Sequence, residues 1–138
     1  MAVKRQCMHF LPIIAYVGLI FFLSSRPYFH APGPEFESKD KVAHFCEYFI
    51  LGVLLFKAIG WSASRDMFIN FLFLLAVGVS VAALDELFQS YIPGRTMSVM
   101  DWVADTAGIG FGVGLFTLTP LGRRKRAVDG LEMNGGKV

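Results

Sequence analysis

The sequence has few charged residues and no surplus of one sign. Asp, Glu, Lys and Arg make up 17% of its 138 residues, and the formal net charge is only +2. A basic stripe interleaved with aromatic side chains, which is typical of nucleic-acid-binding proteins, is also missing. The sequence therefore predicts no nucleic acid as a partner.

Common catalytic and cofactor-binding motifs are missing as well. We find no Gly-x-Ser-x-Gly elbow, no phosphate-binding P-loop, no His-Glu-x-x-His pattern and no Cys-x-x-Cys pair. These absences leave no motif-based indication of a hydrolase elbow, a nucleotide site, a zinc protease or a redox pair. Any function must therefore come from some other arrangement of side chains.

Long apolar runs are what the chain does contain. Hydrophobic residues make up 54% of it, and four runs are almost free of charge: 6–25, 42–56 apart from Glu47, 67–84 and 106–122. Each is near the ~20 residues that cross a ~30 Å hydrocarbon layer, where an open chain satisfies its backbone only as helices. The sequence predicts an all-α integral membrane bundle of four transmembrane helices with short loops. This domain would span residues 1–122, followed by a basic and then flexible tail at 123–138.

The basic residues predict how this bundle is oriented. Four spans would put most of them on one side of the membrane, which the positive-inside bias assigns to the cytoplasm together with both termini. Cys7 and Cys46 would then lie near opposite faces, so we expect two free thiols. The predicted inner set is Lys4, Arg5, Lys57, Arg65, Arg123, Arg124, Lys125, Arg126 and Lys137, and the outer set is Arg26, Lys39, Lys41 and Arg95.

The first apolar run has a second interpretation as a secretory signal peptide. Lys4 and Arg5 precede the apolar stretch from His9 to Leu23, as in a signal sequence. No clean small-x-small cleavage site follows, and the run is long enough to remain as an anchor. We therefore expect it to be retained as the first span.

Polar residues interrupt the apolar pattern where three of the spans are predicted to reach the outer face. Because neighbouring spans are antiparallel, the start of the second, the end of the third and the start of the fourth meet at one level. Charges in spans are costly and usually face a bundle interior or a wet cavity. The predicted polar region consists of Lys41, His44, Glu47, Asp85, Glu86, Gln89, Arg95, Asp101 and Asp105. Tyr48 shares a helical face with Lys41 and His44.

Several of these residues also have a purely structural interpretation. Asp101 could be a helix N-cap, whereas Asp105 lies a full turn further on and is expected to meet a partner inside the bundle. Pro93-Gly94 predicts a tight turn with a positive φ at the glycine. Arg95 could neutralise the nearby acids or hold a phosphate or carboxylate of a ligand.

Small residues predict close helix packing. Ala104, Gly108 and Gly112 form a stripe on the fourth span, and Gly78 and Ala82 form another on the third. We expect these two stripes to bring the acidic turns of the third and fourth spans together.

Charge balance leaves the question of a metal open. Five carboxylates in a low-dielectric region cannot all stay ionised without partners. Either some of them are protonated, or basic side chains and a cation balance their charge. Mg²⁺ or Ca²⁺ would suit oxygen ligands, whereas Zn²⁺ would favour more than one histidine. His9 and His30 are predicted elsewhere, so a multi-histidine zinc site is not expected, and no cofactor is assigned.

Three motifs in order give the chain a family resemblance. Asp40-Lys41-x-x-His44-x-x-Glu47-Tyr48, Asp85-Glu86-x-x-Gln89 with Pro93-Gly94-Arg95, and Asp101 and Asp105 before Gly108 resemble the VanZ-like family of small bacterial membrane proteins over about residues 10–120. The family is named for an accessory protein of teicoplanin resistance. The resemblance implies a multi-pass protein of the bacterial cytoplasmic (inner) membrane and an association with glycopeptide resistance. It carries no settled reaction.

Two classes of function follow. In the first, the polar region binds or processes the headgroup of an envelope lipid or peptidoglycan precursor, with Glu47 or Asp85 as general base and His44 as acid or ligand. In the second, the polar residues lock the helix bundle and the protein contacts other envelope proteins. Whether the chain is an enzyme, and its oligomeric state, stay open. In the first class the ligand-binding residues are Lys41, Tyr48, Glu86, Gln89, Arg95, Asp101 and Asp105.

Overall fold

Four helices make up the fold seen in a computed structural model of the chain. They are α1 (Ala2–Ser24), α2 (Lys39–Ile59), α3 (Met67–Gln89) and α4 (Val99–Leu118). The structure describes residues 2–27, 39–59 and 67–118, and within them it contains no strand. The prediction of an all-α chain with four helices is confirmed. The predicted tail at 123–138 and the side chain of Cys7 lie outside the described part, whereas Cys46 is a free, exposed cysteine.

The lengths of the helices match the thickness of a membrane, but their apolarity differs. With 20 to 23 residues each and a rise of 1.5 Å per residue, they are about 30–35 Å long. Among the described residues, one helical stretch, Phe68–Gln89, is long and apolar enough to cross a membrane, and Phe10–Ser24 is a shorter apolar stretch. Charged residues at the start of α2 and α4 lower the apolarity of those helices. Four spans thus remain a prediction.

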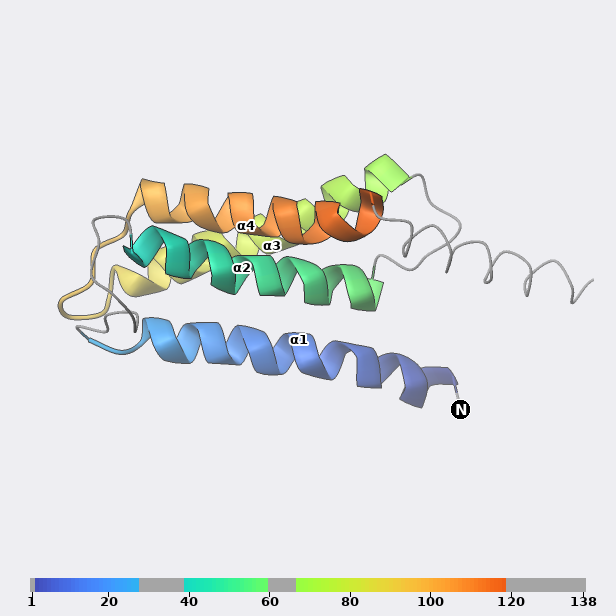
Figure 1. The fold of residues 1–138 in the computed structure, drawn as a ribbon. Coiled ribbons are helices and arrows are strands. Elements are labelled where there is room, and N and C mark those ends of the chain that lie inside the picture. Colours follow the sequence, from blue (N-terminus) through green and yellow to red (C-terminus); the bar gives the residue numbers. More distant parts are fainter. Residues whose placement is uncertain (1, 28–38, 60–66, 119–138) are drawn as a thin grey trace, which may run out of the picture.

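The helices run lengthwise beside one another and alternate in direction (Figure 1). The end of α1, the start of α2, the end of α3 and the start of α4 therefore lie at one end of the bundle, at the left of the figure. We call this the polar end. The opposite end holds the N-terminus, the end of α2 and the start of α3.

Glycines set the closest contact, which joins α2 to α4. A Cβ on Gly108 would collide with the backbone carbonyl of Phe45, and a Cβ on Gly112 with that of Phe49. On α2, a Cβ on Gly52 would lie 2.7 Å from the carbonyl oxygen of Ile109. Only glycine permits this approach, which is typical of helix pairs in membranes.

This contact corrects the expected pairing of small-residue stripes. Gly108 and Gly112 of this stripe face α2 instead of α3, and α2 offers Gly52 as a small counterpart. Gly78 of α3 lies instead beneath the side chain of Ile109, which would be 2.7 Å from an added Cβ. The end of α3 and the start of α4 meet through polar contacts described below.

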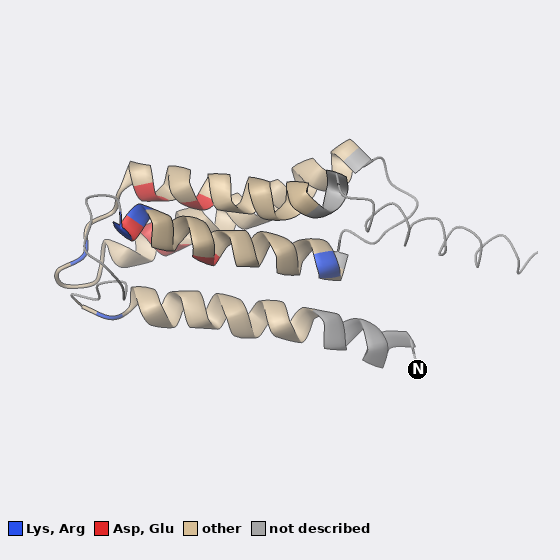
Figure 2. Ribbon diagram, in the orientation of Figure 1, with Lys and Arg blue, Asp and Glu red and all other residues tan. Residues whose placement is uncertain are grey.

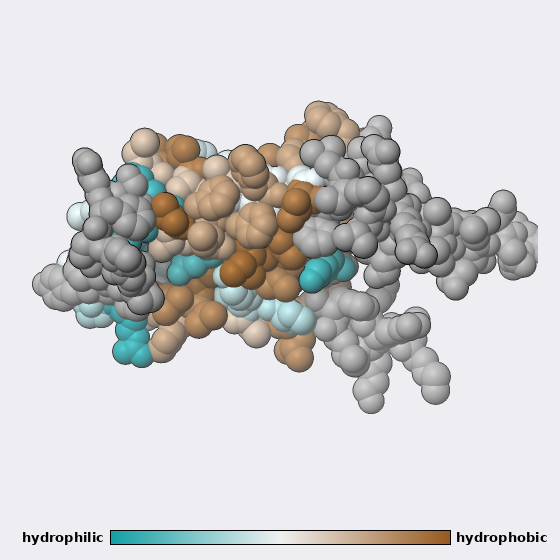
Figure 3. Space-filling model, viewed as in Figure 1, coloured by the Kyte–Doolittle hydropathy of each residue, from teal (hydrophilic) through white to brown (hydrophobic). Residues whose placement is uncertain are grey.

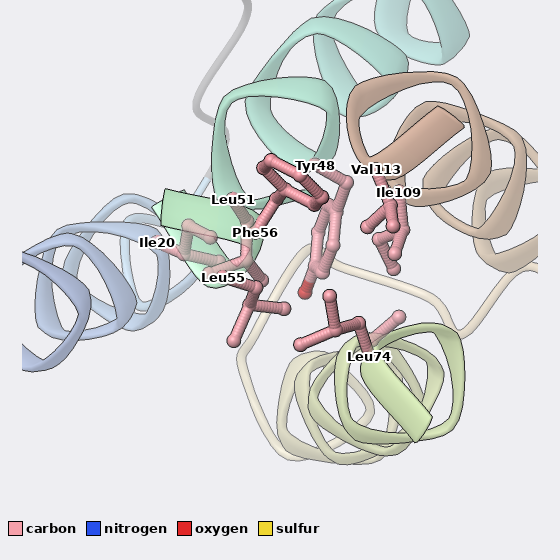
Figure 4. Close-up of a cluster of buried hydrophobic side chains, with 9 residues drawn as sticks. Ile20, Tyr48, Leu51, Leu55, Phe56, Leu74, Ile109 and Val113 are labelled. Atoms are coloured by element: carbon pink, nitrogen blue, oxygen red, sulfur yellow. The ribbon is translucent and has the colours of Figure 1, made fainter. Parts of the chain in front are cut away.

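A hydrophobic cluster fills the middle of the bundle (Figure 4). Tyr48, Leu51, Leu74 and Ile109 are almost completely buried, and Ile20 brings α1 into the same cluster. Apolar residues also cover much of the outside in the view of Figure 3, where hydrophilic colour lies near the polar end, at mid-length and beside the opposite end. Exposed examples occur on all four helices, among them Phe22, Ile50, Phe68 and Phe111.

Candidate functional site

Acidic residues gather at the polar end, where α2 and α4 begin and α3 ends (Figure 2). Many of the polar side chains at this end are buried. The buried polar and charged residues among those described are Ser24, Lys39, His44, Asp85, Glu86, Gln89 and Asp105. Apart from Lys39, they form two groups, which share the bundle end but join different helices.

The first group joins α2 to α4 and α3. Nδ1 of His44 on α2 lies 3.0 Å from Oδ1 of Asp105 on α4, and both side chains are buried. Asp105 thus meets a partner inside the bundle, as predicted from its position one turn into the helix. The hydrogen bond puts a proton between an imidazole nitrogen and a carboxylate, an arrangement that can transfer protons.

Glu86 and Asp101 complete this group around His44. One potential ligand atom from each of the three residues lies within 4.8 Å of the other two. Lys41 Nζ lies 3.6 Å from Oδ1 of Asp101, near the rim, where the Lys41 side chain is 42% exposed. The first group therefore contains an imidazole, three carboxylates when Asp105 is counted, and one lysine at its edge.

Ser98 holds this group in place and was not predicted from the sequence. Its hydroxyl accepts a hydrogen bond from the backbone N–H of Asp101 at 3.2 Å, which makes Ser98, and not Asp101, the N-cap of α4. The backbone N–H of Ser98 in turn donates to Oε2 of Glu86 at 2.7 Å. The Ser-x-x-Asp spacing of an N-cap was the sequence signal for Ser98.

The second group joins α1 to the end of α3. Ser24 Oγ donates to Oδ2 of Asp85 at 2.9 Å, and Gln89 Nε2 donates to the same oxygen at 3.0 Å. Gln89 also donates to Ser24 Oγ at 3.3 Å. The sequence analysis did not identify Ser24 as a site residue, because no local pattern places the end of the first helix against Asp85.

Arg95 belongs to the second group, where it binds an amide side chain and backbone carbonyls instead of a carboxylate. Its guanidinium donates to Oε1 of Gln89 at 3.2 Å and, at 3.5 Å each, to the backbone carbonyls of Leu23 and Arg26 at the end of α1. Among the described residues, no salt bridge joins it to an acid. Gly94 precedes it with φ of 81°, so the predicted positive φ in the turn is confirmed.

Tyr48 and Glu47 occupy different surroundings from those of the two groups. Tyr48 is fully buried in the hydrophobic cluster, although its hydroxyl has no hydrogen-bond partner among the residues described. Glu47 is half-buried, and its backbone carbonyl accepts a 3.1 Å hydrogen bond from Tyr16 of α1. Its carboxylate is close enough to interact electrostatically with His44, Asp85 and Asp105. Glu47 therefore lies between the two groups.

Three buried carboxylates each leave one oxygen without a hydrogen-bond partner within the described ranges. These oxygens are Oδ1 of Asp85, Oε1 of Glu86 and Oδ2 of Asp105, on side chains that are at most 3% exposed. An unsatisfied buried acceptor costs about 1–3 kcal/mol, and more when it is charged. Each of these oxygens can still accept a hydrogen bond or bind a cation.

Comparison with known protein families gives one result of direct bearing. The family described as VanZ/LLP1 matches residues 10–120, which include both polar groups. Comparisons with curated proteins and with solved structures give no match. Because the matched region is well over half of the 138 residues, the chain belongs to the VanZ/LLP1 family.

Proposed function

We propose that this chain is a multi-pass protein of the bacterial cytoplasmic membrane whose polar end binds, or acts on, the headgroup of an envelope lipid or peptidoglycan precursor. One observation carries the proposal: Asp85, Glu86 and Asp105 each direct an oxygen without a hydrogen-bond partner, among the residues described, into a buried region at one end of an apolar bundle. The association with glycopeptide resistance that the VanZ-like resemblance implies is part of the same proposal.

Membrane placement is supported by the outer surface of the bundle. Large apolar side chains such as Leu72 and Phe73 of α3 and Phe111 of α4 are exposed on the outside of the bundle, where lipid would solvate them. Exposed apolar surface on this scale is unusual in a soluble monomer. The polar end would then lie at a membrane boundary, which is the level at which lipid headgroups are found.

The proposed chemistry of the ligand follows from the hydrogen-bond donors that the two groups lack. Carboxylate oxygens without partners require donors, such as the hydroxyl, amide or ammonium groups of a sugar, peptide or amino headgroup. Lys41 at the rim is placed to interact with a phosphate. In this proposal the His44–Asp105 pair transfers protons, and Glu47 or Asp85 acts as the general base, as the sequence suggested.

The test separates binding from folding. Glu47→Gln and Asp85→Asn preserve shape and hydrogen-bonding capacity but remove charge, so we expect melting temperatures in detergent near that of the parent. Binding of a lipid-linked peptidoglycan precursor in nanodiscs should be lost in both. Asp40→Asn, which changes an exposed acid at the same end, is the matched control. Variants that melt far below the parent yet retain binding would contradict the proposal.

A structural role is the second candidate, and the second group favours it. Hydrogen bonds of 2.9 to 3.3 Å link the side chains of Ser24 on α1, Asp85 and Gln89 on α3, and Arg95 in the segment after α3. A network of this kind fixes one helix against another without any ligand. If it is the whole purpose of the polar end, Asp85→Asn should lower stability and leave every binding measurement unchanged.

A further inference from the structure

We propose that His44, Glu86 and Asp101 bind one divalent metal ion that accepts both nitrogen and oxygen ligands, with Mn²⁺ as its probe. The three residues come from three helices, α2, α3 and α4, and present ligand atoms within 4.8 Å of one another. With metal–ligand bonds of about 2.2 Å, two ligands of one ion lie up to about 4.4 Å apart. Small side-chain rotations are therefore enough to form the site.

Glu86 supplies independent support, because its carboxylate is fixed but only half used. Oε2 accepts the backbone N–H of Ser98 at 2.7 Å, which holds the carboxylate at the junction of α3 and α4. Oε1 is buried without a hydrogen-bond partner in the described part of the chain, on a side chain that is 3% exposed. A metal ion would satisfy this oxygen, which is otherwise costly to bury.

His44 has the carboxylate partner that metal-binding histidines usually have. Its Nδ1 is bonded to Asp105, so the other ring nitrogen, Nε2, remains for a metal. A carboxylate behind a histidine ligand fixes the tautomer and makes the imidazole a stronger ligand. Asp105 is therefore a positioning residue in this proposal, and it does not touch the ion.

Charge balance also favours a divalent ion. Glu86, Asp101 and Asp105 carry three negative charges when ionised, and Lys41 beside Asp101 provides one positive charge. Within this group of residues, a divalent ion with neutral His44 raises the positive total to three. Protonated His44 without a metal gives only two. One imidazole with two carboxylates suits Mn²⁺ better than Zn²⁺, which favours more nitrogen or sulfur, or Mg²⁺ and Ca²⁺, which favour oxygen alone.

The first experiment titrates Mn²⁺ into the full chain, purified without an affinity tag and treated with a chelator, and follows free Mn²⁺ by electron paramagnetic resonance. We expect one saturable site per chain. His44→Gln and Glu86→Gln should weaken binding at least tenfold, and Asp105→Asn by about 10–100-fold through its effect on His44. Asp40→Asn, at an exposed position of the same end, should change the affinity less than twofold.

Substitution of Lys41 should strengthen Mn²⁺ binding, whereas the substitutions above should weaken it. Its ammonium competes with the ion for Asp101, so Lys41→Gln should strengthen Mn²⁺ binding. Lys57→Gln makes the same change of charge at the other end of α2 and should have little effect. Equal affinity in the parent, His44→Gln and Glu86→Gln proteins, or no saturable binding, would overturn the proposal.

A measurement on the unaltered protein covers the case in which a variant fails to fold. Pulsed electron paramagnetic resonance of bound Mn²⁺ detects the hyperfine coupling of a directly bound imidazole nitrogen. We expect one such nitrogen in the parent chain and in a His9→Gln/His30→Gln variant. Bound Mn²⁺ without nitrogen coupling would overturn the site. Headgroup binding in the presence of chelator is a separate readout, so the two proposals can fail independently.

Discussion

Asp105 on α4 and His44 on α2 form a hydrogen bond of 3.0 Å at a buried position between the two helices that approach most closely. The other carboxylate oxygen of Asp105, Oδ2, has no hydrogen-bond partner among the described residues. The pair therefore belongs both to the polar end and to the contact between α2 and α4. Replacing one or both residues measures what the hydrogen bond contributes to the stability of the bundle.

We expect the single variant Asp105→Val to lower the free energy of unfolding by about 3–5 kcal/mol, because it leaves a buried imidazole without its partner. The double variant His44→Leu/Asp105→Val should recover most of this loss, since an apolar pair of similar volume is often neutral. Denaturant titrations in detergent micelles measure both. A double variant no more stable than the single one would contradict the prediction.

Gly108 should be intolerant of even one methyl group. The Cβ of Gly108→Ala would meet the backbone of Phe45 and Phe49, which cannot rotate away as a side chain can. We expect a loss of about 1–3 kcal/mol or more, typical of overpacking. Gly114→Ala on the same helix places its Cβ in open space and should be neutral or slightly stabilising. Comparable melting temperatures for the two variants would argue against the close approach of α2 and α4.

Arg95 should hold the end of α1 to the rest of the bundle. Arg95→Ala removes the donors to Gln89 and to the carbonyls of Leu23 and Arg26, so hydrogen exchange at 23–26 should become faster. Arg95→Lys should not restore protection, because one ammonium cannot replace a planar fork with several donors. Exchange followed by mass spectrometry measures this, with the end of α2 as an internal reference. Unchanged exchange in Arg95→Ala would show that α1 is held by other contacts.

The sequence contained enough to predict four helices and the end of the bundle at which polar residues meet. Apolar runs define helices because lipid or a core must cover them, and alternating direction then brings the start of α2 to the end of α3. Asp105 could be assigned a buried partner because it lies beyond any capping position. These inferences depend on distances along the chain, which the sequence contains directly.

Which helix faces lie together could not be predicted in the same way. Gly108 and Gly112 of α4 pack on α2, and Arg95 binds the carbonyls of Leu23 and Arg26. These choices depend on helix rotation and on partners far away in the chain. Backbone carbonyls and capping groups such as those of Leu23 and Ser98 also leave little trace in a residue pattern. Tyr48 shows the same limit: it shares a helical face with His44 in sequence but lies deeper, within the hydrophobic cluster.

The orientation of the bundle gives the last prediction. Nine basic residues are expected on the side of the termini and four on the side of the polar end, so the polar end should face outward from the cytoplasm. In a chain with both native cysteines replaced by serine, Thr96→Cys in the exposed turn before α4 should react with a membrane-impermeant maleimide in intact spheroplasts. Gly135→Cys in the tail should react only after the membrane is permeabilised. If Thr96→Cys were protected and Gly135→Cys labelled, the polar end would face the cytoplasm, and a headgroup ligand would have to come from the inner leaflet.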